Sequence, residues 1–220
     1  MPVSLHSSSQ DGSTGASSAS WSHVGPSSAG LYDMVLVLTG IFQNPAPTVT
    51  YGGQALTEIS AVANNYLRAF YRINPLAGTQ TVSVSVGSAI SYIRGVCLYL
   101  QGVDTDNPFS ATATNSVTHS DTGGPNTLSV SLSSWAAQHY LVSSFQFSNG
   151  TYLSVSGASL LHSNTNLFVA TNLNGDTPVS PKTVTWSYNR QPDTYRTHAI
   201  AIAPKILGNQ MQIGGGVVGL

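Results

Sequence analysis

The side chains best suited to metal chemistry lie in one short acidic turn. Asp104, Asp106 and Asn107 follow an apolar run and precede Pro108. Hard cations such as calcium bind several carboxylate and carbonyl oxygens at close spacing. This turn lacks the further acidic ligand and the central glycine of the helix–loop–helix calcium motif, whereas Asp and Asn are ordinary turn formers. The sequence therefore predicts a plain strand-end turn and no metal.

Other residues capable of catalysis are scattered along the chain. The histidines do not stand two or four residues apart beside a carboxylate, the spacing that would indicate a zinc site. They are His6, His23, His119, His139, His162 and His198. No Gly-x-Ser-x-Gly elbow occurs, and Glu58 is the single glutamate. We therefore expect no enzyme activity, no catalytic residue and no cofactor. A hydrolase stays an alternative, because carboxylates or a Ser–His pair distant in sequence can converge in the fold.

Gly52 and Gly53 fit either a phosphate-binding loop or a hairpin. The loop needs a following helix and a Lys with Ser or Thr at a set place, and the sequence offers neither. Two glycines between alternating apolar pieces suit a two-residue turn, in which both take a positive φ. The sequence predicts a hairpin here.

Charge is scarce throughout the 220 residues. Only 7% of the residues are charged and the formal net charge is −1, against about 25% charged in an ordinary soluble domain. Such a surface must be solvated by Ser, Thr, Asn and Gln or covered by other subunits. We therefore expect a homo-oligomer, with a trimer as one candidate state. Nucleic acid is not expected as a partner, because no basic patch could neutralise phosphates.

Membrane and export signals are absent from the pattern. Residues 1–20 lack the basic start and apolar core of a signal peptide, and no apolar run approaches about 18 residues. The sequence thus predicts no membrane partner and synthesis without export. The single cysteine, Cys97, lies in an apolar run, which indicates a buried, inert thiol.

Strand patterns fill most of the chain. In residues 79–86, Val82, Val84 and Val86 alternate with Thr and Ser, the period of two of a half-buried strand. Turn-rich pieces separate about eleven such segments. They are residues 19–24, 33–42, 46–59, 66–73, 79–86, 92–100, 126–132, 139–147, 166–171, 182–188 and 197–203. The spacing predicts an all-β fold, an antiparallel two-sheet β-sandwich that is jelly-roll-like.

The domain organisation is expected to be simple. Residues 1–205 form one sandwich domain, in which the polar residues 1–18 are a loop or an edge strand. Residues 206–220 form a glycine-rich apolar arm, which cannot fold alone and is expected to dock on a neighbouring subunit. The partner-binding residues of this arm are Ile213, Val217, Val218 and Leu220.

The aromatic residues leave a glycan-binding alternative open. Trp21, Trp135, Trp186 and ten tyrosines can pack a core or line a sugar platform. Several stand near turns or beside Asn and Arg, namely Tyr66, Phe70, Tyr71, Tyr188 and Tyr195. A carbohydrate-binding module would present them as an exposed patch.

Several pieces in order resemble one family of sandwich modules. These pieces are "SWSHV", "DMVLVLTGI", "VTYGGQALTEIS", "AFYRINPLAGTQTVSVSV", "RGVCLYLQGVDTDNPF", "VTWSYN" and "HAIAIAP". Over residues 19–204 the chain is similar to the β-sandwich (jelly-roll or immunoglobulin-like) module of phage virion structural proteins and bacterial surface proteins. The resemblance implies display, adhesion or assembly, and it carries over no catalytic residue.

The missing export signal favours the phage setting over the secreted one. The resemblance then implies a virion structural protein assembled in the host cytoplasm, acting as a capsid decoration or cement protein. Its partners would be other virion proteins such as a major capsid protein. A tail or fibre component is the alternative position, and a carbohydrate-binding module is the alternative function.

Overall fold

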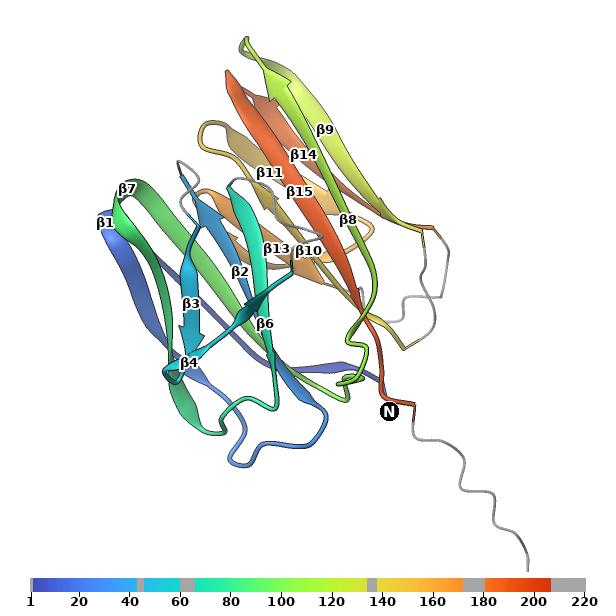
Figure 1. Ribbon diagram of the computed structural model, residues 1–220. Helices are drawn as coiled ribbons and strands as arrows, with labels where there is room; N and C mark the ends of the chain where they lie inside the picture. The colour runs from blue at the N-terminus through green and yellow to red at the C-terminus, as the bar shows by residue number, and fades with distance from the viewer. Residues whose placement is uncertain (1, 43–45, 60–65, 134–137, 172–180, 207–220) are drawn as a thin grey trace, which may run out of the picture.

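The computed structural model describes residues 2–42, 46–59, 66–133, 138–171 and 181–206. These residues form strands joined by turns (Figure 1). The first strands are β1 (Ser4–Val24), β2 (Asp33–Ile41), β3 (Thr48–Tyr51), β4 (Gln54–Ala55), β5 (Thr57–Glu58), β6 (Leu67–Ile73) and β7 (Thr79–Gln101). The others are β8 (Phe109–His119), β9 (Gly123–Leu132), β10 (Tyr140–Gln146), β11 (Thr151–Ser156), β12 (Ser159–Asn164), β13 (Leu167–Thr171), β14 (Lys182–Arg190) and β15 (Asp193–Ile202). Across these ranges no helix is long and apolar enough to cross a membrane.

The strands pair into antiparallel sheets. A seven-stranded sheet has the order β4-β3-β7-β2-β6-β5, with β1 paired to β7. A five-stranded sheet has the order β12-β13-β10-β15-β8, and a three-stranded sheet the order β11-β14-β9. The predicted all-β antiparallel sandwich class is confirmed. The described residues hold three hydrogen-bonded sheets, where the sequence predicts two.

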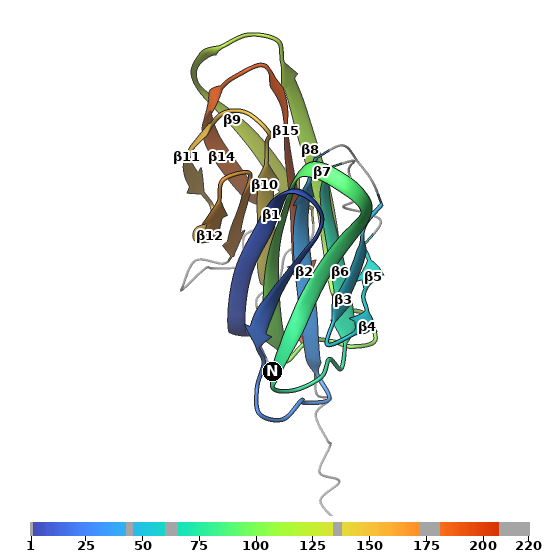
Figure 2. The same cartoon turned by 90° about the vertical axis from the view of Figure 1, so that its left-hand side faces the viewer.

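The largest sheet folds over on itself because two of its strands bend. Residues 4–14 of β1 pair with residues 92–101 of β7, and residues 18–24 pair with residues 79–85. Gly15 and Gly87 take positive φ values of 65° and 75° near the bends, a conformation that costs little for glycine. Figure 2 shows β1 and β7 curving together. The polar start of the chain is thus an edge strand, and the two predicted segments 79–86 and 92–100 form one strand.

The two halves of the chain repeat one pattern of strand pairing. The second part of β7 pairs with β2 and with the first part of β1, as β15 pairs with β10 and β8. The first part of β7 pairs with β3 and with the last part of β1, as β14 pairs with β11 and β9. Strands β6 and β5 extend from β2 as β13 and β12 extend from β10. Residues 2–101 and 109–202 are therefore two sandwiches of the same topology, the N-terminal and C-terminal halves.

The buried apolar side chains form three layers, one inside each half and one between the halves. One lies inside the N-terminal half around Trp21, Tyr51 and Tyr99, and one inside the C-terminal half around Phe145 and Trp186. The third, the shared layer, lies between the halves and takes side chains from both. Across it β7 contacts β13 while β6 contacts β15. Equivalent strands exchange contacts in this way when a two-fold axis relates two units.

A polar network also joins the halves. The Arg196 guanidinium lies 3.9 Å from the ring centroid of Tyr66, and its Nη1 donates to Gln146 Oε1 at 3.3 Å. Gln146 Nε2 in turn donates 2.5 Å to the Tyr92 hydroxyl, which lies 3.2 Å from Ser148 Oγ. Tyr66 and Tyr92 belong to the N-terminal half and the other residues to the C-terminal half. The network therefore orients one sandwich on the other.

Candidate functional site

The acidic turn is closed by a lysine. Lys205 Nζ lies 3.3 Å from Asp104 Oδ1 and 2.9 Å from Asp106 Oδ2, and 5.6 Å from the ring centroid of Tyr32. The hydrogen bonds to Asp106 and Asp104 raise the pKa of Lys205. Within the described ranges no group of three His, Cys, Asp or Glu could hold a metal. The ammonium stands where a calcium ion would need to sit, so the turn anchors the last strand and the start of the arm.

Calcium is therefore expected to leave the melting temperature unchanged. The same result is expected for the variant Asp104→Asn/Asp106→Asn, because the parent site already holds a cationic side chain. Differential scanning fluorimetry with and without calcium checks both chains. A rise in the parent that the variant loses would mean that the turn binds the ion, since a ligand of the folded state stabilises it.

His23 lies in a directional hydrogen-bond chain inside the N-terminal half. Trp21 Nε1 donates to Ser9 Oγ at 3.0 Å, and Ser9 Oγ lies 2.7 Å from His23 Nδ1. His23 Nε2 lies 3.1 Å from Ser7 Oγ, which donates to the Val24 carbonyl oxygen at 2.6 Å. This order assigns the proton to Nε2 and makes Nδ1 an acceptor. The hydrogen bonds of Ser7 and Ser9 thereby join the first part of β1 to Trp21 and His23 in its last part, across the bend.

Lowering the pH should reduce the stability of the folded protein, because His23 is protonated more readily in the unfolded chain. Burial, followed by the nearby His6, lowers the pKa of His23 from 6.5 to about 4. The unfolded chain then binds the proton more readily, so stability is complete above about pH 6.5 and declines as the pH falls towards 4. We expect a loss on the order of 2 to 3 kcal/mol over that window. Urea denaturation from pH 4 to 7 measures it.

His23→Gln is the control for this pH dependence. Burial also lowers the pKa values of His139 and His162, so some acid sensitivity should persist in the variant. The parent and His23→Gln must differ in slope between pH 4 and 6.5. Parallel curves for the two chains would contradict the assignment.

Two further Ser–His pairs occur in the C-terminal half. Ser144 Oγ lies 2.8 Å from His198 Nε2, and both residues are completely buried. Ser110 Oγ lies 3.3 Å from His139 Nδ1 and donates to the Ala201 carbonyl oxygen at 3.3 Å. A buried pair has no path to a substrate, and the hydroxyl of the second pair already has a backbone acceptor. These pairs therefore tie strands together.

The aromatic side chains singled out from the sequence serve packing. Phe70, Tyr188 and Tyr195 are buried, as are Trp21 and Trp186. Tyr71 packs edge-to-face on Phe109 with centroids 4.8 Å apart, and Arg196 covers Tyr66. Trp135 lies outside the described residues. The residues that the structure describes from this set do not form a flat sugar platform.

Two surfaces made of hydroxyl side chains cover the outer layers. The N face takes Ser18, Ser20 and Ser22 from β1, Thr81, Ser83 and Ser85 from β7, and Thr48 and Thr50 from β3. The C face takes Thr127, Ser129 and Ser131 from β9, Thr183, Thr185 and Ser187 from β14, and Ser154 and Ser156 from β11. All sixteen are exposed or half-buried. The strands are topologically equivalent, so the two faces are counterparts on opposite sides of the molecule.

The faces arise from strand alternation. Val82, between Thr81 and Ser83, is completely buried beside Trp21 and Tyr51, so its neighbours in sequence point outwards. Cross-strand hydrogen bonds then order the hydroxyls. Ser20 Oγ lies 3.0 Å from Ser83 Oγ on the N face. On the C face, Thr185 Oγ1 lies 2.8 Å from Ser129 Oγ and Thr183 Oγ1 lies 2.8 Å from Ser131 Oγ. Alternation in residues 79–86 could have revealed from sequence the part of the N face that β7 contributes, but not the residues of β1 and β3 that join it.

A small cavity lies next to Lys205, whose amide donates to the carbonyl oxygen of the lining residue Gly102. Its volume is about 320 Å³, and its lining includes Leu31, Tyr32 and Asp33. Asp33 Oδ2 accepts from the Gly30 amide at 2.7 Å and from the Tyr99 hydroxyl at 3.0 Å. Leu31 is 77% exposed and Ile206 is 80% exposed. Exposed apolar side chains mark this region as a second candidate interface.

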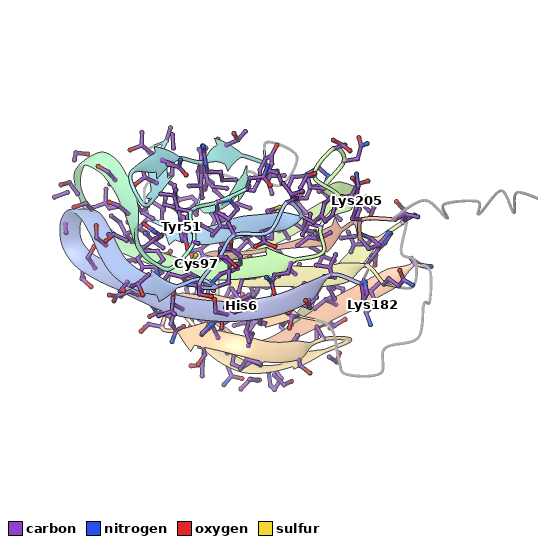
Figure 3. The ribbon with its side chains drawn as sticks, turned by 90° about the horizontal axis from the view of Figure 1, so that it is seen from below. His6, Tyr51, Cys97, Lys182 and Lys205 are labelled. Carbon is purple, nitrogen blue, oxygen red and sulfur yellow. The ribbon has the colours of Figure 1, made fainter. Side chains whose placement is uncertain are left out.

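Other predicted residues have mixed outcomes. The arm residues Ile213, Val217, Val218 and Leu220 lie outside the described residues, so their role stays a prediction. The hairpin is confirmed, because Gly52 and Gly53 have φ values of 55° and 78° and Tyr51 pairs with Gln54. Cys97 is buried as predicted, and burial raises its pKa; Figure 3 shows it inside the N-terminal half.

Comparison with known proteins does not assign this chain to a family. No family model matches the chain, and no curated protein matches it. One similar solved structure is the N-terminal domain of the Streptococcus gordonii adhesin Sgo0707, with 8% sequence identity and a TM-score of 0.23. The match covers 83% of this chain and 51% of that one, so the chain spans about half of that structure's length. A likeness this distant carries no functional argument.

Proposed function

We propose that this protein is a phage virion structural protein that decorates or cements a capsid by binding other virion proteins. The single observation that supports a binding role best is the pair of equivalent, uncharged hydroxyl faces on opposite outer layers. The phage setting rests on the sequence resemblance over residues 19–204. The virion and its assembly in the host cytoplasm belong to the same proposal.

The hydroxyl faces suit contact with an uncharged protein surface. Each hydroxyl can donate and accept, so it can be satisfied by many partner groups. No lysine, arginine, aspartate or glutamate stands among the face residues, so docking buries no unpaired charge there. Because the faces point in opposite directions, one molecule can contact two copies of a coat protein. Bridging of this kind multiplies weak contacts into strong attachment.

Charge placed in the faces tests this role. Ser83→Asp on the N face and Thr185→Asp on the C face should each weaken binding to particles that lack the protein by about tenfold, because docking must then bury a carboxylate. The matched control is Ser120→Asp, an exposed serine between β8 and β9 that belongs to neither face. Co-sedimentation with such particles measures binding. Unchanged binding of the Ser83→Asp/Thr185→Asp double variant would refute the role of the faces, and particles that never retain the parent chain would refute the capsid role.

The arm is proposed to supply a second contact through Ile213, Val217, Val218 and Leu220. Lys205, the residue before the arm, donates its amide to the Gly102 carbonyl oxygen at 2.8 Å, and Gly102 lines the cavity. We expect deletion of residues 206–220 to leave the circular dichroism spectrum unchanged and to weaken particle binding or self-association. Equal particle binding and equal self-association of the full and shortened chains would show that the arm does not contribute to binding.

A further inference from the structure

The two halves place equivalent edge strands at the surface, and the structure treats these edges differently. In the N-terminal half the edge is β1. Its ladder with β7 shifts register between Leu5 and Ser7 and between Ala16 and Ser18. Such irregularities disrupt an edge that could otherwise pair with another chain.

The edge of β1 is also touched by the C-terminal half. Gln10 Nε2 donates to the Ser163 carbonyl oxygen at 3.4 Å, and Asn164 Nδ2 donates to the Asp11 carbonyl oxygen at 3.5 Å. Asp11 adds a charge to the strand. Bulges, a charge and a neighbouring strand are ways in which proteins protect an open edge.

The counterpart edge, β8, has fewer protections. Its ladder with β15 shifts register only near its start, between Phe109 and Ala111, and one side chain ties it to β9, where Asn115 Nδ2 donates to the Ser129 carbonyl oxygen at 2.7 Å. It contains no charged residue, no proline and no glycine over its eleven residues. Residues 111–119 pair with β15 in unbroken register, and Thr114, Asn115 and Ser116 are exposed. Within the part of the chain that is described, β8 pairs on one side only. A long, uncharged and regular edge of this kind presents backbone groups to another strand.

We propose that β8 pairs with β8 of a second copy of this chain. Antiparallel pairing of identical strands around a two-fold axis is self-complementary, and each copy brings the same uncharged edge. The five-stranded sheets of two copies would then join into one continuous sheet. Full use of residues 111–119 sets Asn115 opposite Asn115 of the partner subunit, and Thr114 opposite the partner's Ser116. The inference concerns self-association and does not depend on the capsid assignment.

Paired charges on β8 test both the contact and its register. Thr114→Lys/Ser116→Lys sets lysine opposite lysine at both positions, and like charges directly opposite destabilise a strand pair. Thr114→Lys/Ser116→Glu sets lysine opposite glutamate and serves as the matched variant. Analytical ultracentrifugation of the full chain should show a dimer for the parent and the Lys/Glu variant. The dimer dissociation constant of the Lys/Lys variant should be at least about tenfold higher than that of the parent. Its circular dichroism spectrum should show that it is folded.

A monomeric parent overturns the proposal, as does a trimer or dimer that the Lys/Lys variant leaves intact. Loss of association in both variants overturns the proposed register. Asn115→Cys gives an independent check, because mild oxidation should link two copies through residue 115, whereas the parent's buried Cys97 should form no such link. Particle binding by the Lys/Lys variant shows separately whether the capsid role survives.

Discussion

Replacing Leu98 by alanine should lower the free energy of unfolding by about 2 to 5 kcal/mol, the range for emptying a buried leucine site. Leu98 is completely buried in the shared layer, where it belongs to β7 and pairs with Leu36 of β2. The layer takes side chains from both halves, so its loss should destabilise both. Urea denaturation gives the size of the effect. Hydrogen exchange in β2 and β10 shows whether the halves open together.

Leu76→Ala is the control for this experiment. Leu76 is 40% exposed, and surface substitutions of this kind usually change stability by no more than about 0.5 kcal/mol. A Leu98→Ala chain in which only β2 loses protection would mean that the halves unfold independently. Joint loss would support the expected single domain over residues 1–205.

Gly157→Ala should cost about 2 to 5 kcal/mol, which combines left-handed backbone strain with overpacking. Gly157 has a φ of +78° in the turn between β11 and β12, and an added Cβ would overlap the carbonyl oxygen of Thr183 on β14. A backbone atom of a paired central strand cannot move aside without disturbing its ladder. Thermal denaturation followed by circular dichroism measures the loss.

Gly87→Ala isolates the collision from the backbone strain. Gly87 has nearly the same φ, +75°, but nothing lies within 4 Å of an added Cβ. It should lose only about 1 to 2 kcal/mol, the cost of a left-handed non-glycine residue. Equal losses in the two variants would show that the Thr183 contact has no effect.

The sequence revealed the core strands better than the polar ones. Alternating valines in residues 79–86 and the apolar run of β2 carry a clear signal, because burial selects residue type on the inner side. Strands β8, β11 and β12 were not predicted, since their Ser, Thr and Asn residues are equally typical of loops. The polar residues of β1 adopt an extended strand because they pair with β7 along the whole length of β1. That long-range pairing leaves no local pattern.

The candidate surfaces and the repeated strand pairing were harder still to predict from the sequence. The duplication is recorded in strand pairing, whereas equivalent strands differ in composition: β2 is DMVLVLTGI and β10 is YLVSSFQ. Single-chain patterns cannot reveal which serines share a face until the register is known, as with Ser20 and Ser83. The His23 chain likewise depends on the bend that returns Trp21 and His23 to Ser9 and Ser7.

The long β1 and β7 ribbon has a consequence for biosynthesis. Ser4 pairs with Gln101 and Val24 with Thr79, so β1 is synthesised well before its partner strand and cannot be fully paired until Gln101 has followed it. Topologies dominated by such distant pairings fold in milliseconds to seconds, because loop closure must precede the contacts that reward it. The nascent N-terminal segment is hydroxyl-rich and carries one formal charge over β1, Asp11. Its low hydrophobicity protects the waiting chain from premature association.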